Sequence, residues 1–544
     1  MPYPHMTIQS SVTDKDRMTN AASESACITS ETGDQRTSSQ NCDNNKQHFA
    51  TEHLLANLKG RTISSGFVTV FAQAIQFALN LGSVMVLARL LAPQDFGLVA
   101  MATTITGFLR VFNDAGLSTA TVQREGITHA QVSNLFWTNV ALGGTATLIL
   151  AASAPAVAWF YREPRVVGIT LALSVTFLLT SSAVQHLAIL RRQMRFKMIA
   201  LIQVGSIAAG AMVGIGMAWL KYGYWSLVGM QLTIPVVTFW LTLMASHWRP
   251  QLPKGSSGTR SLLTFGANLT ASTFLWSLAR SSDGLLIGRF WGSAPLGLYS
   301  RAAALLLRPV EQLISPIEAV FVPTLSRLQP QPDRYRRSFL KIYDIIAVIG
   351  FPVSALFLVL AHPLTLVVLG SKWEKAAPIF AGFTLVALYT PVASVASWLL
   401  ASQGRGKDFL VLSLIGSAGT ILSFLLGLPF GPVGVAMSYS AYCLFIGLPV
   451  TYYVVGRQGP VTTTDLWSRF LMHLPLWGIV CGTTFVFHRL VQTSAPFIQL
   501  WICGSAGLLA GASFICVYPP ARRTVLEFLA LVSDWHKARK APAI

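Results

Sequence analysis

Apolar stretches long enough to cross a membrane recur along this chain from Phe67 to Tyr518. A transmembrane helix needs about 20 mostly apolar residues, and only helices and closed barrels satisfy every backbone polar group inside a bilayer. Charged residues make up 11% of the chain and hydrophobic residues 53%, whereas soluble domains usually carry about 25% charged residues. The recurrence of these runs predicts an all-α polytopic membrane protein.

The runs, divided by Pro, Gly and charged residues, predict about fourteen transmembrane helices. The expected spans are 64–88, 96–121, 131–160, 166–189, 198–220, 224–246, 262–288, 295–325, 338–361, 376–401, 409–428, 432–456, 470–488 and 498–518. Lys and Arg number 17 in the loops on one side and 8 on the other, which by the positive-inside rule places both termini in the cytoplasm. The stretch HPLTLVVLGSKWEKA in the longest outward loop predicts a short helix at the membrane interface.

The first 62 residues are of another kind, because they are rich in Ser, Thr, Asn and Gln and have a net charge of −1. They cannot bury a core and are predicted to be a disordered cytoplasmic tail. The basic residues of the membrane part lie in short loops, as insertion requires, so nucleic acid is not an expected partner. No cysteine has metal-ligand spacing, and neither a metal nor a cofactor is expected. Residues 519–544 are expected to form a cytoplasmic C-terminal tail.

An internal repeat links the two halves of the chain. The segment ARLLAPQDFGL matches GRFWGSAPLGL at an offset of 200, which aligns Gly97 with Gly297, and LKYGYWSLV echoes LPFGPVGVA at an offset of 208. A chance match of glycines in a Gly-rich chain is the alternative. Transporters are commonly built from such repeats, with a site at their interface. We therefore expect two pseudo-symmetric six-helix lobes and two further C-terminal helices, within residues 63–250, 260–457 and 468–518.

Several motifs carry a family resemblance between about Leu58 and Gly456. They are LLAPQDFGLVAMATTITGFLRVFNDAGLSTATVQREGITHAQVSNLFWTN, ILRRQMRFK, YGYWSLV, DGLLIGRFWG, LGLYSRA and PTLSRLQ. In this order they resemble the Wzx-type lipopolysaccharide and exopolysaccharide flippases, which belong to the multidrug, oligosaccharidyl-lipid and polysaccharide exporter superfamily.

The resemblance implies a transporter rather than an enzyme, with a central cavity that opens alternately to either side of the bacterial inner membrane. It implies movement of an undecaprenyl-pyrophosphate-linked oligosaccharide to the periplasmic leaflet for exopolysaccharide or lipopolysaccharide biosynthesis. It also implies that the last two helices help to hold the polyprenyl tail. The expected partners are this lipid, the bilayer, and the polymerase and glycosyltransferases of the same pathway, whereas the sugar itself is left open.

Charged side chains inside the predicted spans are the candidate site residues, because an isolated ion there costs between ~3 and more than ~10 kcal/mol. Residues three, four or seven apart share one face of a helix. Arg280 with Asp283, Arg110 with Asp114, and the stripe of Arg301, Arg308, Glu311 and Glu318 follow these spacings, as do the amides Gln73, Gln76 and Asn80 in the first span. The repeat relates these four helices, so their polar stripes are expected to face one cavity.

Arginine suits a pyrophosphate, because its planar donors stay protonated and can bind bidentately. A buried carboxylate with few partners suits ion coupling. We expect Arg110, Arg280, Arg301, Arg308 and Asn80 to bind the substrate, and Asp283, Asp114, Glu311 and Glu318 to be candidates for coupling to H⁺ or Na⁺.

Structural alternatives remain open for these residues. Arg280 and Asp283 could form a structural ion pair, Arg301 could snorkel to the interface, and the two glutamates could lie at a helix end. Pro309, Pro316 and Pro323 are expected to bend or break the eighth span, and Asp344 is expected at the interface.

Two other functions compete with the flippase. An antiporter of drugs or small metabolites within the same superfamily would favour acids over arginines in its cavity. A membrane glycosyltransferase or polymerase needs positioned carboxylates, commonly on a large outward loop, whereas the Asp-x-Asp of this chain, Asp14 with Asp16, lies in the polar tail.

Overall fold

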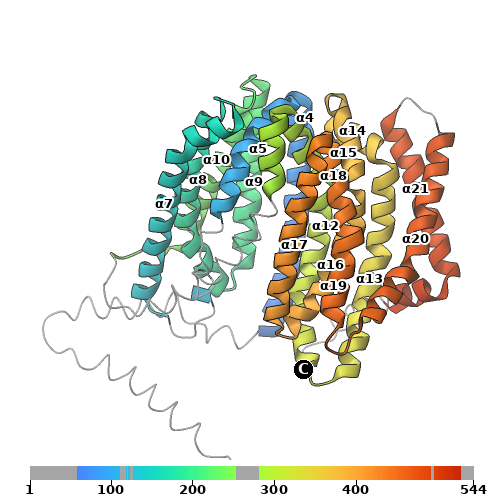
Figure 1. Cartoon of the computed structure of the whole chain (residues 1–544). Coiled ribbons are helices and arrows are strands. Elements are labelled where there is room, and N and C mark those ends of the chain that lie inside the picture. The colour runs from blue at the N-terminus through green and yellow to red at the C-terminus, as the bar shows by residue number, and fades with distance from the viewer. Residues whose placement is uncertain are drawn as a thin grey trace, which may run out of the picture.

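A computed structural model describes residues 58–110, 118, 121–122, 127–252, 281–491 and 495–527, and its regular elements are all helices. Figure 1 shows the long helices side by side in one bundle, with α7 at one edge and α20 and α21 at the other. The long helices are α4 (Leu58–Leu90), α5 (Pro93–Arg110), α7 (His129–Tyr161), α8 (Val166–Arg192), α9 (Phe196–Trp219), α10 (Trp225–Ser246), α12 (Ser293–Leu328), α13 (Pro332–Val359), α16 (Thr384–Ser402), α17 (Gly406–Gly427), α20 (Thr463–Leu490) and α21 (Pro496–Val517). The shorter elements are α14 (Ala361–Leu369), η1 (Ser371–Ala376), α15 (Ala377–Gly382), η2 (Leu428–Phe430), α18 (Gly431–Tyr442), η3 (Cys443–Gly447) and α19 (Leu448–Gly456).

Ten helical stretches of the described part are long and apolar enough to cross a membrane. They lie at predicted positions, and the stretch Gly406–Gly456 covers two of the expected spans. Of the remaining expected spans, one is α5, one falls largely on residues outside the described part, and one is α12, whose charged residues lower its hydropathy. The protein is therefore an all-helical membrane protein with about ten clear spans, and the count of fourteen stays a prediction.

Three local expectations can be checked. The segment HPLTLVVLGSKWEKA is helical as expected, as α14 followed by η1, and its place at the membrane interface stays a prediction. The expectation that Pro309, Pro316 and Pro323 bend or break the eighth span is wrong where it requires a break, because α12 is helical throughout. Membrane helices tolerate proline where neighbouring groups satisfy the freed carbonyls. The predicted span 376–401 is divided at Phe383 into α15 and α16.

The predicted tails fall mostly outside the described residues. For the N-terminal tail, residues 1–62, the structure describes only the part from Leu58, where α4 begins. For the C-terminal tail, it describes residues 519–527.

Helices α5 and α12 meet in a reciprocal backbone contact. A Cβ atom on Gly97 would overlap the carbonyl oxygen of Ser293, and a Cβ atom on Gly297 would overlap the carbonyl oxygen of Pro93. Both pairs are related by the offset of 200 found in the sequence repeat. Only glycine, which has no Cβ, allows the two backbones to approach this closely. The internal repeat therefore extends from the sequence to the contacts between helices.

Arg195 and Arg405 make equivalent contacts in the two halves of the chain. Each joins the start of one helix to the end of another. Arg195, just before α9, donates from Nη1 to the carbonyl of Ala245 at 2.9 Å, near the end of α10. Arg405, just before α17, donates from Nη1 to the carbonyl of Val455 at 2.8 Å, near the end of α19. The residues before the two arginines are left-handed, with φ of 53° and 68°. The two left-handed residues, the two arginines and the two carbonyl residues are each 210 positions apart in the sequence. The matching sequence motifs had not revealed this offset.

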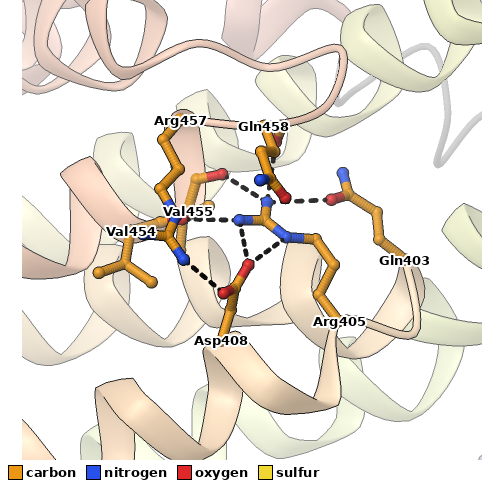
Figure 2. Close-up of polar contacts among 7 residues, drawn as sticks. All are labelled: Gln403, Arg405, Asp408, Val454, Val455, Arg457 and Gln458. Atoms are coloured by element: carbon orange, nitrogen blue, oxygen red, sulfur yellow. Dashed lines mark hydrogen bonds and ion pairs between the residues drawn. The ribbon is translucent and has the colours of Figure 1, made fainter.

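Arg405 is the centre of a larger polar cluster, shown in Figure 2. Its Nε donates to Asp408 Oδ2 at 2.8 Å, and Arg457 Nη2 donates to Asp408 Oδ1 at 2.5 Å. Arg405 Nη1 donates to oxygens of Gln403, Val455 and Gln458, and Nη2 donates to the carbonyl of Val454. The cluster joins the start of α17 to the end of α19.

A buried carboxylate joins α20 to α13. Asp344 accepts from Arg469 Nη1 at 2.7 Å and lies 3.0 Å from His473 Nε2. These partners cover the side chain, so only 6% of Asp344 is exposed, and its expected place at the membrane interface stays a prediction. This cluster could not be predicted from the sequence, because Arg469 and His473 are more than 100 residues away from Asp344.

Replacing Asp344 with alanine should lower the stability of the purified protein. The fully buried side chain of His473 would lose its carboxylate partner, and an unsatisfied buried polar group costs about 1–3 kcal/mol. We expect a lower thermal midpoint in detergent for Asp344→Ala. Asp333→Ala, an exposed acid in the first turn of the same helix, is the matched control. Equal midpoints for the two variants would contradict this role.

Candidate functional site

One end of the bundle is closed by contacts between the first and second halves of the chain, which we call the sealed end. It contains the reciprocal glycine contact of α5 and α12. Beside it, Trp373 Nε1 donates to the carbonyl of Ala88 at 2.8 Å, and the Trp373 ring packs edge-on against Phe96 at 5.1 Å. Arg89 Nη2 donates to the carbonyl of Val367 at 3.0 Å. These bonds tie α4 and α5 to the segment that includes α14 and η1.

A cavity of about 640 Å³ lies farther along the same helices. Its walls come from α4, α5, α8, α10 and α12, with Leu369 of α14 on one side. The polar residues that line it are Asn80, Thr103, Thr106, Thr176, Thr180, Gln231, Thr238, Arg301 and Arg308. No Asp or Glu of the described ranges is among the lining residues, so the charge of the cavity wall is positive.

The positive charge comes from two arginines seven residues apart on one face of α12. The guanidinium of Arg301 lies 5.2 Å from the ring centre of Phe96, a distance suited to a cation–π contact. Its Nε is buried and has no hydrogen-bond partner in the part of the chain that is described. Arg308 also lines the cavity and is more exposed. Arg301 therefore faces the cavity, and the structure does not favour the snorkelling alternative.

The structure brings together only some of the expected site residues. Asn80, Arg301 and Arg308 line the cavity. Asp283 is not among the residues that line the cavity. Its Oδ1 accepts from the backbone N–H of Gly284 at 2.6 Å, and its charge lies near Tyr161. The expectation that every polar stripe faces one cavity therefore does not hold for Asp283.

The other expected residues fall elsewhere. Glu311 lies in a smaller neighbouring pocket of about 300 Å³, which it shares with Arg308. Glu318 is exposed farther along α12. Asp114, Arg280 and the side chain of Arg110 lie outside the described residues, so their expected roles remain predictions.

Sequence reasoning missed the threonines and Gln231 of the cavity wall. Thr103 and Thr106 are three residues apart on α5, and Thr176 and Thr180 are four apart on α8, which are spacings that place side chains on one helix face. This signal was present, but hydroxyl side chains are common in membrane helices, where they often bond to their own backbone. Thr106, for example, donates to the carbonyl of Thr103 at 3.0 Å.

Known proteins resemble this chain over most of its length. It is 24% identical over 435 residues to the lipopolysaccharide biosynthesis protein WzxC of Escherichia coli (strain K12), which covers 77% of this chain and 87% of WzxC. It is 25% identical over 492 residues to the succinoglycan biosynthesis transport protein ExoT of Rhizobium meliloti (strain 1021), with 90% and 98% covered.

Solved structures share the fold. The lipid II flippase MurJ in an inward closed conformation superposes with a TM-score of 0.67 at 14% identity, covering 84% of this chain and 98% of MurJ. An inward-facing multidrug resistance MATE family transporter of the MOP superfamily superposes with a TM-score of 0.56 at 13% identity, covering 74% and 99%. The chain thus shares the fold of these two proteins.

A family model described as polysaccharide biosynthesis protein matches residues 86–378. This match includes α5 and α12, the reciprocal glycine contact and both cavity arginines. The chain belongs to the polysaccharide biosynthesis protein family.

Proposed function

We propose that this protein is a flippase that moves a polyprenyl-pyrophosphate-linked oligosaccharide across the bacterial inner membrane by alternating access. The observation that carries the proposal is the cavity wall with Arg301 and Arg308 and without an acid among its described residues. A pyrophosphate supplies the anionic charge that such a wall lacks. Guanidinium groups bind phosphate oxygens with planar, paired donors.

The energetics of the two arginines support an anionic ligand. Charges held away from water are costly unless they are paired. Neither arginine forms an ion pair with a described residue. An incoming pyrophosphate would offset this cost at Arg301, whose Nε is buried, and would also pair with the exposed Arg308, whereas a cationic drug would add to the positive charge of the wall. The drug antiporter is therefore the less favoured candidate.

The proposed direction follows from the sealed end. By the positive-inside rule, the distribution of Lys and Arg in the loops favours a periplasmic position for the sealed end, and the cavity would then load from the cytoplasm. We propose that residues 63–250 and 260–457 act as two lobes and that their rocking opens the sealed end. Ion coupling through Asp283, Glu311 or Glu318 is part of this proposal and would act from outside the cavity.

The test is binding and transport by the purified full chain in proteoliposomes. Undecaprenyl pyrophosphate is the ligand, and undecaprenol, which lacks the phosphates, is the control ligand. Arg301→Ala and Arg308→Ala should each weaken binding of the pyrophosphate by about 10- to 100-fold, because a hydrogen bond to a charged group is worth about 1.5–3 kcal/mol. Transport of lipid-linked oligosaccharide should fall in parallel.

Arg327→Ala is the matched variant, since Arg327 is an exposed arginine in the last turn of the same helix and does not line the cavity. It should bind and transport as the unmodified protein does. If folded Arg301→Ala and Arg308→Ala proteins both kept full affinity for undecaprenyl pyrophosphate, the proposed substrate would be wrong.

A further inference from the structure

We call the cavity lined by Arg301 and Arg308 the arginine cavity. A second pocket, rich in amide side chains, lies next to it. Its volume is about 350 Å³, and it lies between α4, α8, α9 and α12. We call it the glutamine pocket. The residues that line it are Thr69, Ala72, Gln73, Gln76, Arg191, Phe196, Ile199, Ala200, Gln203 and Gln312. Its four glutamines come from three different helices, so the fold gathers them from distant parts of the sequence.

Helices α4, α8 and α12 line both sites, and on each of them residues of the glutamine pocket lie about one turn beyond residues of the arginine cavity. On α4 the lining changes from Asn80 to Gln76, and on α12 it changes from Arg308 to Gln312. Each of these steps is four residues, which is about one helical turn or 6 Å. On α8, Arg191 likewise follows the cavity residue Leu187. All three steps lead away from the sealed end.

The two sites are also linked through the smaller pocket of about 300 Å³. Arg308 lines both that pocket and the arginine cavity, and Gln312 lines both that pocket and the glutamine pocket. A ligand whose phosphates lie at Arg308 would therefore place its next group about one helical turn away, at Gln312.

Apart from Arg191, the polar side chains that line the glutamine pocket are neutral, and most of them are amides. An amide side chain offers both donors and an acceptor, as sugar hydroxyls do, whereas an anion takes donors only. Gln76 Nε2 donates to Gln203 Oε1 at 3.1 Å, which uses one hydrogen of the first amide and leaves both amides able to bond further. No hydrogen bond is seen between Gln73 or Gln312 and any other described residue. Phe196 also lines the pocket, and an aromatic ring is a group against which the C–H face of a sugar can pack.

We propose that the glutamine pocket binds the glycan of the lipid-linked oligosaccharide, next to the pyrophosphate held by Arg301 and Arg308. This inference rests on the proposed function and adds a subsite for hydroxyl-rich sugars. The pocket therefore discriminates a glycosylated lipid from the same polyprenyl pyrophosphate without sugar.

The test compares two ligands on the purified full chain. One is undecaprenyl pyrophosphate, and the other is the lipid-linked oligosaccharide extracted from the host strain. The double variant Gln73→Leu/Gln312→Leu removes amides while it keeps the bond between Gln76 and Gln203. It should bind the glycosylated lipid at least about tenfold more weakly, as expected for a lost hydrogen bond, and bind undecaprenyl pyrophosphate as before.

Control variants separate this inference from the proposed function. Arg301→Ala should weaken binding of both ligands, whereas Gln94→Leu, at an exposed position on α5, should change neither. If Arg301→Ala left both affinities unchanged, the proposed function would fail. If Arg301→Ala behaved as expected and the glutamine variant bound both ligands normally, or lost both equally, only the glycan subsite would fail. Should the double variant not fold, the single variants Gln73→Leu and Gln312→Leu decide the question by the same selective loss.

Discussion

Replacing Gly97 with alanine should abolish transport, although the change adds only one methyl group. That methyl would occupy the position of the Ser293 carbonyl oxygen, so α5 and α12 would have to move apart at the sealed end. Overpacking typically costs about 1–3 kcal/mol, and backbone atoms yield less readily than side chains. Transport by the purified variant in proteoliposomes should be lost. A single cysteine in place of the buried Ser293 should react faster with a membrane-impermeant thiol reagent in a cysteine-free background.

Because the contact between α5 and α12 is reciprocal, a second and sharper expectation concerns Gly297. Gly297→Ala should be as harmful as Gly97→Ala, because it meets the Pro93 carbonyl in the same way. The double variant should cost clearly less than the two single costs together, since one separation of the helices relieves both overlaps. Gly82→Ala is the matched control, because a Cβ there meets no atom within 4 Å. Normal transport and stability of Gly97→Ala would show that the contact is dispensable.

Replacing Arg405 with lysine should destabilise the protein, although the charge is kept. Arg405 binds the Asp408 carboxylate and three backbone carbonyls with one planar group (Figure 2). Lysine has one nitrogen in place of three and cannot reproduce these directions. Carbonyls at the end of α19 would lose partners, at a cost of about 1–3 kcal/mol for each that becomes buried and unsatisfied. The thermal midpoint of the purified variant should fall markedly.

The effect of Arg405→Lys can be compared with that of the equivalent change in the other half of the chain, Arg195→Lys. Arg195 holds the equivalent place in the first half, with a single carbonyl bond to Ala245. Arg195→Lys should therefore lower the midpoint less than Arg405→Lys does. Equal losses would mean that the additional bonds of Arg405 contribute nothing measurable, and an unchanged midpoint for Arg405→Lys would contradict the cluster's role.

The helices were largely predictable from the sequence because the bilayer imposes one simple rule on their length and composition. The predicted span 166–189 corresponds to Val166–Arg192, and 224–246 to Trp225–Ser246. The same rule predicted the span 295–325, which corresponds to α12, although the charged residues of this helix lower its hydropathy. Its prolines were expected to bend or break it, yet it runs unbroken from Ser293 to Leu328.

The candidate site was harder to predict, because helical spacing shows which residues share a face but not where that face points. Spacing grouped Arg301 with Arg308, and both line the cavity. The same reasoning predicted that Asp283 also lines the cavity, whereas Asp283 lies near Tyr161. For Asp344 and for Gln203, the deciding partners lie on helices far away in the sequence. Periodicity within one helix carries no information about such partners.

The reciprocal contact of α5 and α12 has the form of a two-fold symmetric dimer interface, in which each residue pair occurs twice. In a true dimer, every cation on one wall would face an identical cation on the other. Joining the two units in one chain removes that requirement. At the offset of 200, Arg301 corresponds to Met101 and Arg308 to Phe108, and neither Met101 nor Phe108 lines the cavity. Among the described lining residues the charge lies on α12 alone, so the anionic ligand that we propose would bind this part of the wall in a single orientation.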